Sequence, residues 1–203
     1  EYLEQKFGVQ DSLMFFVSDS LKIALVTNHL PVSKIAQNIT QEKIVRKLQL
    51  LNDSLKKDFM IVKPRIAVLA LNPHAGDNGL LGDEEQNIIL PAMKTAQQEH
   101  KIFCAGPFPA DGFFGSTAMK SYDAVLAMYH DQALAPFKAL LMDYGVNFTA
   151  GLPIVRTSPT HGTAYDKVGR NTANENSFRQ ALYNAFDIYK SRKRYKEYSA
   201  NPL

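Results

Sequence analysis

YDAVLAMYHDQALAPFK, residues 122–138, decides the fold of this chain. Its apolar run AVLA is uninterrupted, as in a strand that is buried on both faces, and His130 and Asp131 stand where that strand should end. Two other segments have the same form, LKIALVT (21–27) and RIAVLAL (65–71). Because such strands alternate with helical segments, the sequence predicts an α/β fold with a parallel or mixed sheet covered by helices on both faces.

The segments between these strands have helical patterns. Thr40 is the expected N-cap of a long amphipathic helix. The apolar residues that follow it on one face are Ile44, Leu48, Leu51 and Leu55. A second helix is expected to open on the acidic residues 83–85 and to run to about Glu99, and a last helix is expected to begin near Phe178. KIFCAGPFP (101–109) predicts another strand.

The composition limits the class of protein. With 203 residues, 45% of them hydrophobic and 21% charged, the chain is expected to bury a real core. The 23 basic and 20 acidic residues are interspersed, so the net charge of +3 does not predict a nucleic-acid partner. The basic run KSRKRYKEY (190–198) is expected to be the solvated end of a terminal helix.

Cysteine usage and hydropathy indicate the compartment. Cys104 is the only cysteine, which excludes an internal disulfide and favours a reducing environment. The sequence has no charged-then-apolar leader and no apolar stretch of about 18 residues, so we expect a cytoplasmic protein without a membrane partner. The chain begins with Glu1, in a helical pattern, rather than with methionine, which predicts that residues are missing upstream.

Three of the five histidines follow predicted buried strands: His29, His74 and His130. If these strands are parallel neighbours, the three imidazoles converge on one edge of the sheet, where ligands of such sheets bind. Three neutral imidazoles with open positions form a divalent metal site of the catalytic type. The alternative for any one of them is an ordinary loop residue or a hydrogen-bonded core residue. His100, at the end of a predicted helix, is expected at the surface.

Two charged residues accompany His130. Asp131 is expected either to fix the tautomer of a ligand histidine or hold a water molecule, or else to cap the following helix. Lys138 lies one to two helical turns beyond His130. It is expected either to transfer a proton or bind an anionic substrate, or else to be an ordinary solvated lysine.

Further polar residues lie toward the C-terminus. Asn147 and Arg156 bracket the segment FTAGLPIV, and a guanidinium at a strand end can bind phosphate or carboxylate through two hydrogen bonds. The segment THGTAYDKVGR (160–170) could wrap a nucleotide through its backbone N–H groups. Neither a G-x-G-x-x-G fingerprint nor a P-loop occurs, so the usual nucleotide-binding motifs are absent.

Taken together, four segments resemble the 4-hydroxythreonine-4-phosphate dehydrogenase family of pyridoxal phosphate biosynthesis. They are TNHLP (27–31), LNPHAGDNGLLGDEE (71–85), YHDQALAPFK (129–138) and GVNFTAGLPIVRTSPTHGTAYD (145–166). The segments occur in the order of the family and at similar intervals. The resemblance covers the chain from about Leu21 to Phe178 and is specific, because several independent motifs are in register.

The resemblance implies a set of site residues. The family's metal ligands, which usually hold zinc, fall on His29, His74 and His130, with Mg, Co or Mn as other candidate ions. Its substrate-binding residues fall on Lys138, Asn147 and Arg156. By analogy with the isocitrate and isopropylmalate dehydrogenases, whose fold the family resembles, the residues expected to embrace NAD or NADP are His161, Gly162, Thr163, Ala164 and Asp166. The resemblance also implies a homodimer with a shared active site, to which both subunits contribute metal ligands.

The implied activity is oxidation of 4-phosphooxy-threonine followed by decarboxylation, with Lys138 and Asp131 as catalytic residues. Two alternatives remain open: a related dehydrogenase of phosphorylated four-carbon acids such as phosphothreonate or phosphoerythronate, and a truncated metal-binding dimerisation module without turnover. The chain departs from the family in Ala133, where glycine is usual, and in lacking the N-terminal strands. We therefore expect residues 1–155 to form the central substrate, metal and dimerisation domain, and residues 156–203 to supply the cofactor loop and a helix that returns to a missing first domain.

Overall fold

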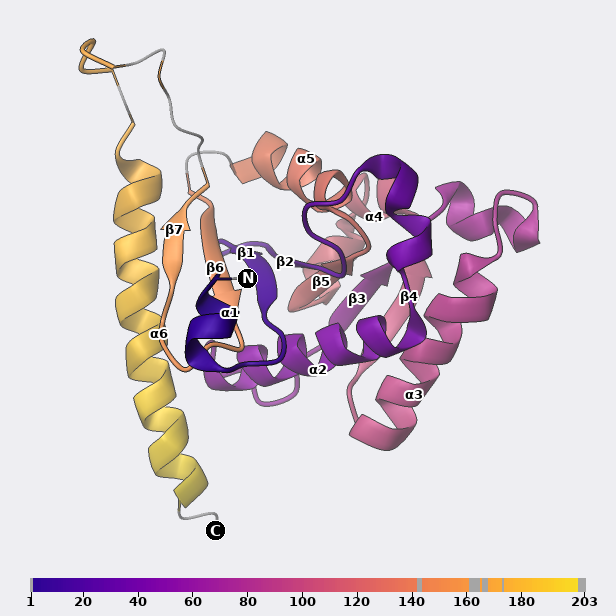
Figure 1. The fold of residues 1–203 in the computed structure, drawn as a ribbon, viewed down its shortest axis with the longest axis horizontal. Helices are drawn as coiled ribbons and strands as arrows, with labels where there is room; N and C mark the ends of the chain where they lie inside the picture. The colour runs from indigo at the N-terminus through magenta and orange to yellow at the C-terminus, as the bar shows by residue number, and fades with distance from the viewer. Residues whose placement is uncertain (1, 142–143, 161–164, 166–167, 173, 201–203) are drawn as a thin grey trace.

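A computed structural model describes residues 2–141, 144–160, 165, 168–172 and 174–200 of the chain. Its centre is a seven-stranded sheet with the strand order β4-β3-β5-β2-β1-β6-β7 (Figure 1). The strands are β1 (Leu13–Val17), β2 (Lys22–Leu25), β3 (Ile66–Leu69), β4 (Cys104–Phe108), β5 (Ala124–Ala127), β6 (Val146–Ala150) and β7 (Thr157–Pro159). Strands β4, β3, β5 and β2 are parallel neighbours, whereas β1 pairs antiparallel with β2 and β6, and β6 pairs antiparallel with β7. The sheet is therefore mixed.

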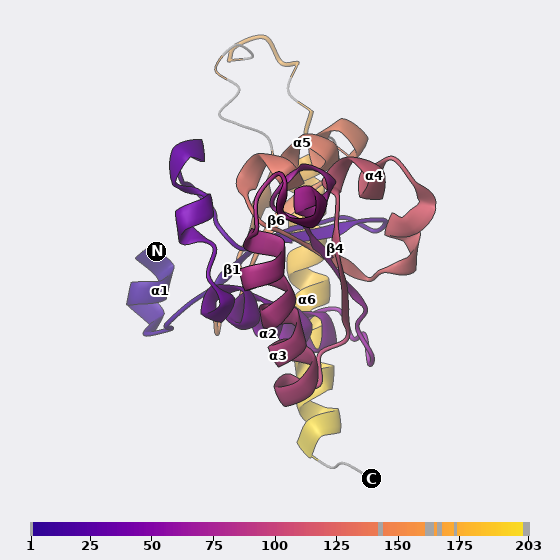
Figure 2. The same ribbon diagram turned by 90° about the vertical axis from the view of Figure 1, so that its right-hand side faces the viewer.

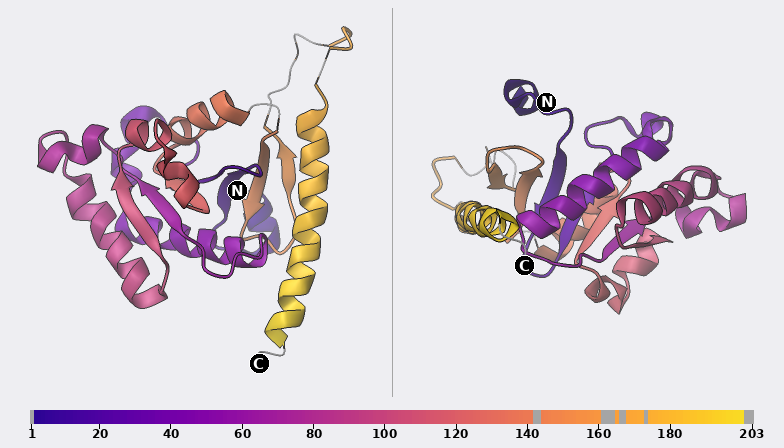
Figure 3. Two further views of the ribbon diagram at one scale, coloured as in Figure 1. Left: turned by 180° about the vertical axis from the view of Figure 1, so that it is seen from behind. Right: turned by 90° about the horizontal axis from the view of Figure 1, so that it is seen from below.

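Helices connect the strands and cover both faces of the sheet. The α-helices are α1 (Tyr2–Phe7), α2 (Gln41–Lys57), α3 (Leu90–His100), α4 (Ala110–Phe114), α5 (His130–Leu141) and α6 (Asn176–Ala200). The short helices are the 3-10 turns η1 (Val32–Lys34), η2 (Ala36–Asn38), η3 (Pro73–Gly79) and η5 (Thr117–Ser121), and the π-helix η4 (Glu85–Ile89). Figures 2 and 3 show α2, α3 and α6 on one face of the sheet and α5 and α4 on the other.

Each face of the sheet has its own hydrophobic core. The larger core joins α2, α3 and α6 to the strands, and the smaller one joins α4 and α5 to the opposite face. Side chains alternate between the two cores along β1, β2, β3 and β5, as the period of a strand requires. In β1, for example, Phe15 packs in the larger core and Phe16 in the smaller one. A sheet with two apolar faces explains why its strands have almost uninterrupted apolar sequences.

Helix α2 follows the pattern in the sequence closely. The side chain of Thr40 accepts a hydrogen bond from the backbone N–H of Lys43 and so caps the first turn, as expected. The four predicted core residues of α2 are fully buried: Ile44, Leu48, Leu51 and Leu55. Each contributes on the order of 1.5–3 kcal/mol of hydrophobic stabilisation, so this face fixes the helix on the sheet.

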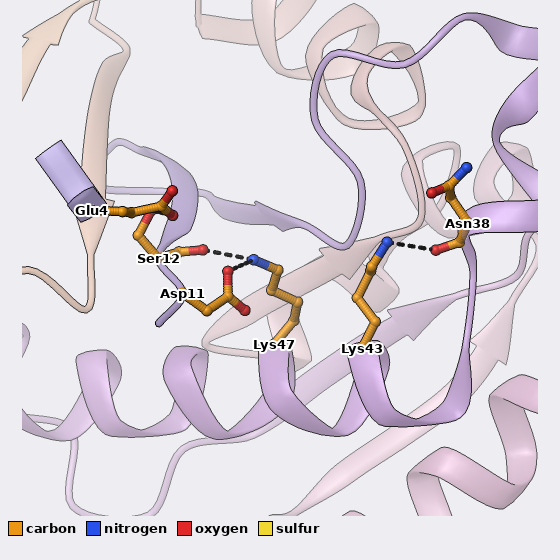
Figure 4. Close-up of polar contacts among 6 residues, drawn as sticks. All are labelled: Glu4, Asp11, Ser12, Asn38, Lys43 and Lys47. Atoms are coloured by element: carbon orange, nitrogen blue, oxygen red, sulfur yellow. Dashed lines mark hydrogen bonds and ion pairs between the residues drawn. The ribbon is translucent and has the colours of Figure 1, made fainter. Parts of the chain in front are cut away.

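The N-terminal segment is tied to α2 by a partly buried ion pair (Figure 4). Nζ of Lys47 lies 2.6 Å from Oδ1 of Asp11 and donates to the backbone carbonyl of Ser12 at 2.6 Å. The hydroxyl of Ser12 donates to the carboxylate of Glu4, and this bond lowers the pKa of that carboxyl. These contacts hold the segment before β1 against α2, and β1 itself pairs with β2, the strand that precedes His29.

The observed fold confirms the predicted α/β class with a mixed sheet and adds one strand. Strand β1 is absent from the prediction, and it pairs antiparallel with β2 and β6. The final helix begins at Asn176, close to the expected start at Phe178. Within the described residues, no helix combines the length and apolarity needed to cross a membrane.

Candidate functional site

The three strands that precede the candidate histidines are adjacent and parallel. Strand β5 pairs with β2 on one side and with β3 on the other. His29 follows β2 and His130 follows β5, while His74 follows β3 after a short connection. The carboxyl ends of the three strands thus meet at one edge of the sheet, which confirms the predicted strand arrangement.

Two buried polar side chains lock these strand ends together. The hydroxyl of Thr27 donates to the carbonyl of Met128 at 2.7 Å and joins the end of β2 to the end of β5. The amide of Gln132 accepts from the N–H of Met128 at 2.7 Å and donates to the carbonyl of Ala70 at 2.6 Å, which joins β5 to β3. Because Thr27 and Gln132 are almost inaccessible to solvent, these bonds are shielded from competition by water. The framework beneath the histidines is therefore rigid.

Two of the three imidazoles come together. The ring centroids of His29 and His130 are 5.9 Å apart, with 45° between the ring planes. Both rings line a cavity of about 320 Å³. The other residues around this cavity are Asn28, Leu30, Val32, Ile35, Tyr129 and Asp131. The lining of the cavity thus combines apolar side chains with imidazole, amide and carboxylate groups.

The neighbouring carboxylate determines which nitrogen of His130 is free. Oδ1 of Asp131 lies 2.7 Å from Nδ1 of His130. An ionised carboxylate can only accept a hydrogen bond, so in the neutral ring the proton lies on Nδ1. The lone pair of Nε2 is then available to a ligand or metal. Asp131 also lies in the first turn of α5, where its charge is favourable to the helix dipole.

His74 is held apart from the pair. It lies in η3, which contacts η4 and β4, on the side of β3 that faces away from β5. Among the described residues, no three His, Cys, Asp or Glu side chains are close enough together to hold one metal ion. The expected convergence of three imidazoles is therefore not seen within a single chain, where only His29 and His130 meet.

The candidate substrate residues lie on the face of the sheet that α5 covers. The ring of Phe137 on α5 is 5.9 Å from that of Phe16 on β1, and Phe16 is the strand partner of Asn147 on β6. Directly paired residues share a face, so Asn147 points to the side of α5. Lys138 follows Phe137 and is exposed. Asn147 lies on β6, three strand positions from β5 or about 14 Å away, whereas Lys138 lies on α5, the helix that begins at His130.

Arg156 contacts the same face of β6 on which Asn147 lies. Its guanidinium donates to the hydroxyl of Thr149 at 3.2 Å, and Thr149 lies two residues after Asn147 on the same face of β6. Oδ1 of Asn147 is buried and has no hydrogen-bond partner within the described part of the chain. A buried acceptor without a donor is uncommon, so this atom is suited to a ligand that brings one.

Sequence reasoning missed three polar residues near the histidines. Asn28 lines the cavity with a buried Oδ1 that also has no partner among the described residues. Gln132 and Glu85 are buried and bond to backbone groups at the strand ends. The sequence offers little signal for them: Gln132 is a polar residue among apolar ones in a helix, and Glu85 is one of three acidic residues at a helix start. The predicted cofactor residues His161, Gly162, Thr163, Ala164 and Asp166 lie outside the described residues.

Two curated relatives of this chain are 4-hydroxythreonine-4-phosphate dehydrogenases. The 4-hydroxythreonine-4-phosphate dehydrogenase of Bacteroides thetaiotaomicron is 57% identical over 204 residues, which cover 100% of this chain and 56% of that protein. The protein of the same name from a Sulfurihydrogenibium species is 45% identical over 193 residues, covering 95% of this chain and 59% of that one. The chain therefore spans less than two thirds of the length of these curated relatives.

Solved structures agree as well. The crystal structure of 4-hydroxythreonine-4-phosphate dehydrogenase from Klebsiella pneumoniae matches with a TM-score of 0.79 at 35% identity, covering 92% of this chain and 56% of that chain. A terephthalate 1,2-cis-dihydrodioldehydrogenase from Burkholderia xenovorans, at 22% identity and a TM-score of 0.73, shares the fold. The model of the family described as pyridoxal phosphate biosynthetic protein PdxA matches residues 1–185. Since this match includes most of the chain, the chain belongs to the PdxA family of pyridoxal phosphate biosynthetic proteins.

Proposed function

We propose that the full protein is a metal-dependent dehydrogenase that oxidises 4-phosphooxy-threonine (4-hydroxy-L-threonine phosphate) with NAD or NADP in vitamin B6 biosynthesis. The observation that carries this proposal is the pair of His29 and His130, with Asp131 on Nδ1 of His130, in a chain of the PdxA family. Relatives 42–57% identical to this chain are named 4-hydroxythreonine-4-phosphate dehydrogenase, which supports the substrate.

The donors around the cavity fit a divalent metal. Imidazole nitrogens suit zinc and other first-row metals, and the carboxylate on Nδ1 leaves Nε2 of His130 as a basic ligand. Asn28 lines the same cavity, and its unpartnered Oδ1 could add an oxygen donor. We place zinc at this site, with Mg, Co and Mn as alternatives. His74 would be the third ligand, supplied across the interface of a homodimer with a shared active site.

The chemistry divides between the bound groups and the side chains. When bound, the metal would polarise the substrate hydroxyl and the nicotinamide would accept the hydride, after which the β-keto acid loses carbon dioxide. Arg156 and Asn147 would hold the anionic and polar ends of the substrate, using the guanidinium and the unpartnered Oδ1. Lys138 would transfer the proton or offset developing negative charge at the reacting oxygen. Asp131 would keep the proton on Nδ1 of His130.

The remaining expectations complete the proposal. The loop residues His161, Gly162, Thr163, Ala164 and Asp166 would bind the adenosine half of the cofactor. Residues 1–155 would form the central substrate, metal and dimerisation domain, and residues 156–203 would add the cofactor loop and the last helix. A cytoplasmic location fits an enzyme that uses NAD and a small phosphorylated acid.

The test is NADH formation from 4-phosphooxy-threonine by the full protein loaded with zinc. The expected result is turnover that Lys138→Ala lowers by about a hundredfold or more, as for loss of a general acid or base, while zinc stays bound. Lys120→Ala, at another exposed lysine in η5, is the matched control. Absence of turnover in the zinc-loaded wild type would contradict the proposed reaction, and wild-type kinetics in Lys138→Ala would remove Lys138 from the mechanism.

A further inference from the structure

The turn that carries His74 has an unusual backbone. Five consecutive residues, 74–78, have positive φ angles of 51°, 53°, 80°, 42° and 56°. Only Gly76 among them lacks a Cβ atom, and a left-handed conformation costs other residues roughly 1–2 kcal/mol each. A turn of this kind persists only where surrounding contacts hold it, and such turns are concentrated at functional sites.

The main contact is the carboxylate of Glu85. Its Oε1 accepts hydrogen bonds from the backbone N–H groups of Leu71 and Asn72, both at 2.8 Å. Its Oε2 accepts from Nδ2 of Asn72 at 3.0 Å. Glu85 is 2% exposed, and a buried charge requires such donors. The carboxylate thus fixes the two residues through which the chain enters the left-handed turn.

The same carboxylate packs against the middle of the turn. A Cβ atom placed on Gly76 would lie 2.8 Å from Oε2 of Glu85 and 2.7 Å from the carbonyl oxygen of Gly82. Both distances are far below van der Waals contact, so the turn fits around the carboxylate only with glycine at position 76. The backbone N–H of Leu81 donates to the carbonyl of Gly76 at 3.0 Å and closes the turn.

The backbone around Glu85 is also irregular. Glu85 is the first residue of the π-helix η4, which leads directly into α3. π-Helical turns inside helices are rare and occur frequently at functional sites, because the wider turn re-aims the side chains at its start. Here the side chain at that position points under the turn that carries a candidate metal ligand.

We propose that Glu85 is a positioning residue, which holds the left-handed turn so that His74 is presented to the metal. The proposal rests on the proposed function for the role of His74. Glu85 itself bonds to backbone and amide groups rather than to the metal. Its effect on metal binding would be indirect. Glu85 would set the position and mobility of the imidazole of His74, which follows its hydrogen-bond partners Leu71 and Asn72 by three and two residues.

The test compares four variants of the full protein: Glu85→Gln, Glu85→Met, Glu84→Gln and His74→Ala. Glutamine keeps one carbonyl oxygen for the two backbone N–H groups, whereas methionine has similar length and no strong acceptor. Glu84→Gln is the matched control, because it removes the neighbouring charge while its amide oxygen can still accept from Nδ2 of Asn72, which Glu84 now bonds at 2.7 Å. The measurements are amide hydrogen exchange of residues 71–82 and the dissociation constant of zinc, by competition with a chromophoric chelator.

The expected order of exchange protection in the turn is wild type, then Glu85→Gln, then Glu85→Met. Zinc affinity should fall in the same order, by about tenfold to a hundredfold, and approach the affinity of His74→Ala. The zinc affinity of Glu84→Gln should stay near that of the wild type. If His74→Ala weakens zinc binding and Glu85→Met does not, the positioning proposal is wrong and the metal site stands. If His74→Ala binds zinc like the wild type, His74 is no ligand and both proposals fail.

Discussion

The imidazole rings of His29 and His130 lie 5.9 Å apart at the carboxyl ends of two neighbouring parallel strands. The two residues belong to segments far apart in the sequence, and the bonds of Thr27 and Gln132 to the backbone near residue 128 bring the strand ends into register. A pair of imidazoles on a rigid edge binds a metal with little loss of conformational entropy. Metal binding is therefore the property that tests this site most directly.

The first prediction concerns His130. His130→Ala should remove tight zinc binding and leave the fold intact, because the ring is 39% exposed and is no part of either core. Zinc content after dialysis and urea unfolding of the same sample check both statements. His100→Ala, at the exposed end of α3, is the control and should keep its zinc. An unchanged zinc content in His130→Ala would refute the assignment.

Asp131 should tune metal affinity without binding the metal itself. In Asp131→Asn the side-chain amide is a weaker acceptor for the N–H of His130, so the imidazole becomes less basic and less firmly oriented. Zinc affinity should fall by about tenfold or more. Asp111→Asn is the matched control, since Asp111 is also an acidic residue in the first turn of a helix. Equal affinities in the two variants would mean that Asp131 acts only on the helix.

Gln132 should be important for stability. Gln132→Leu keeps the apolar bulk but leaves the N–H of Met128 and the carbonyl of Ala70 without the bonds they now make. Each of the two buried groups left unpaired costs about 1–3 kcal/mol, so the free energy of unfolding should fall by about 2–6 kcal/mol. Urea denaturation measures it, with Gln98→Leu on the exposed side of α3 as the control. A loss below about 1 kcal/mol would show that water or rearrangement replaces the bridge.

Periodicity and capping chemistry predicted the elements that are determined locally. Helix α2 needs only Thr40 and its four-residue apolar stripe, and β2, β3 and β5 need only their apolar runs. Strand β1 was missed, although LMFFV is as apolar as the other strands. A turn at Ser18, whose hydroxyl donates to the carbonyl of Leu21, separates it from β2 and makes the pair a hairpin.

The geometry of the site was harder to predict, because it depends on contacts between distant segments. NPHAGDNG contains residues that tolerate a left-handed conformation, such as glycine, asparagine and aspartate, but nothing in it requires five in succession, and Ala75 disfavours it. The turn is selected by a carboxylate eleven residues after His74, and the sequence gives Glu85 only as one of three acidic residues at a helix start. For the same reason the three histidines were expected to converge, whereas η3 carries His74 to the side of β4.

The thiol of the single cysteine should react very slowly in the folded protein. Burial raises the pKa of the Cys104 thiol from 9.0 to about 11, so almost no thiolate is present near neutral pH. At about pH 8, alkylation by iodoacetamide should be roughly a hundredfold slower in the native protein than in urea. The raised pKa also means that this group lowers stability as the pH rises from 9.0 toward 11. Equal labelling rates would show that the strand β4 opens readily.

The last prediction concerns the anchor of α6. Nε of Arg192 lies 2.6 Å from Oδ1 of Asp58, which is 2% exposed in its side chain and also accepts from the hydroxyl of Ser54. The Nη1 group of Arg192 donates to the carbonyls of Leu152 and Ile154, so one guanidinium joins α6 to α2 and to the chain after β6. Arg192→Met should lower the free energy of unfolding by about 3–5 kcal/mol, because it leaves a buried carboxylate without its cation.

Asp58→Asn combined with Arg192→Met should cost less than the sum of the two single changes, since the double variant leaves no uncompensated charge. Arg194→Met, at an exposed position of the same helix, is the control and should change stability by less than about 0.5 kcal/mol. Urea unfolding of all four variants gives the coupling energy. An additive double variant would mean that Arg192 stabilises α6 through its two carbonyl contacts alone, and that the carboxylate of Asp58 is satisfied without it.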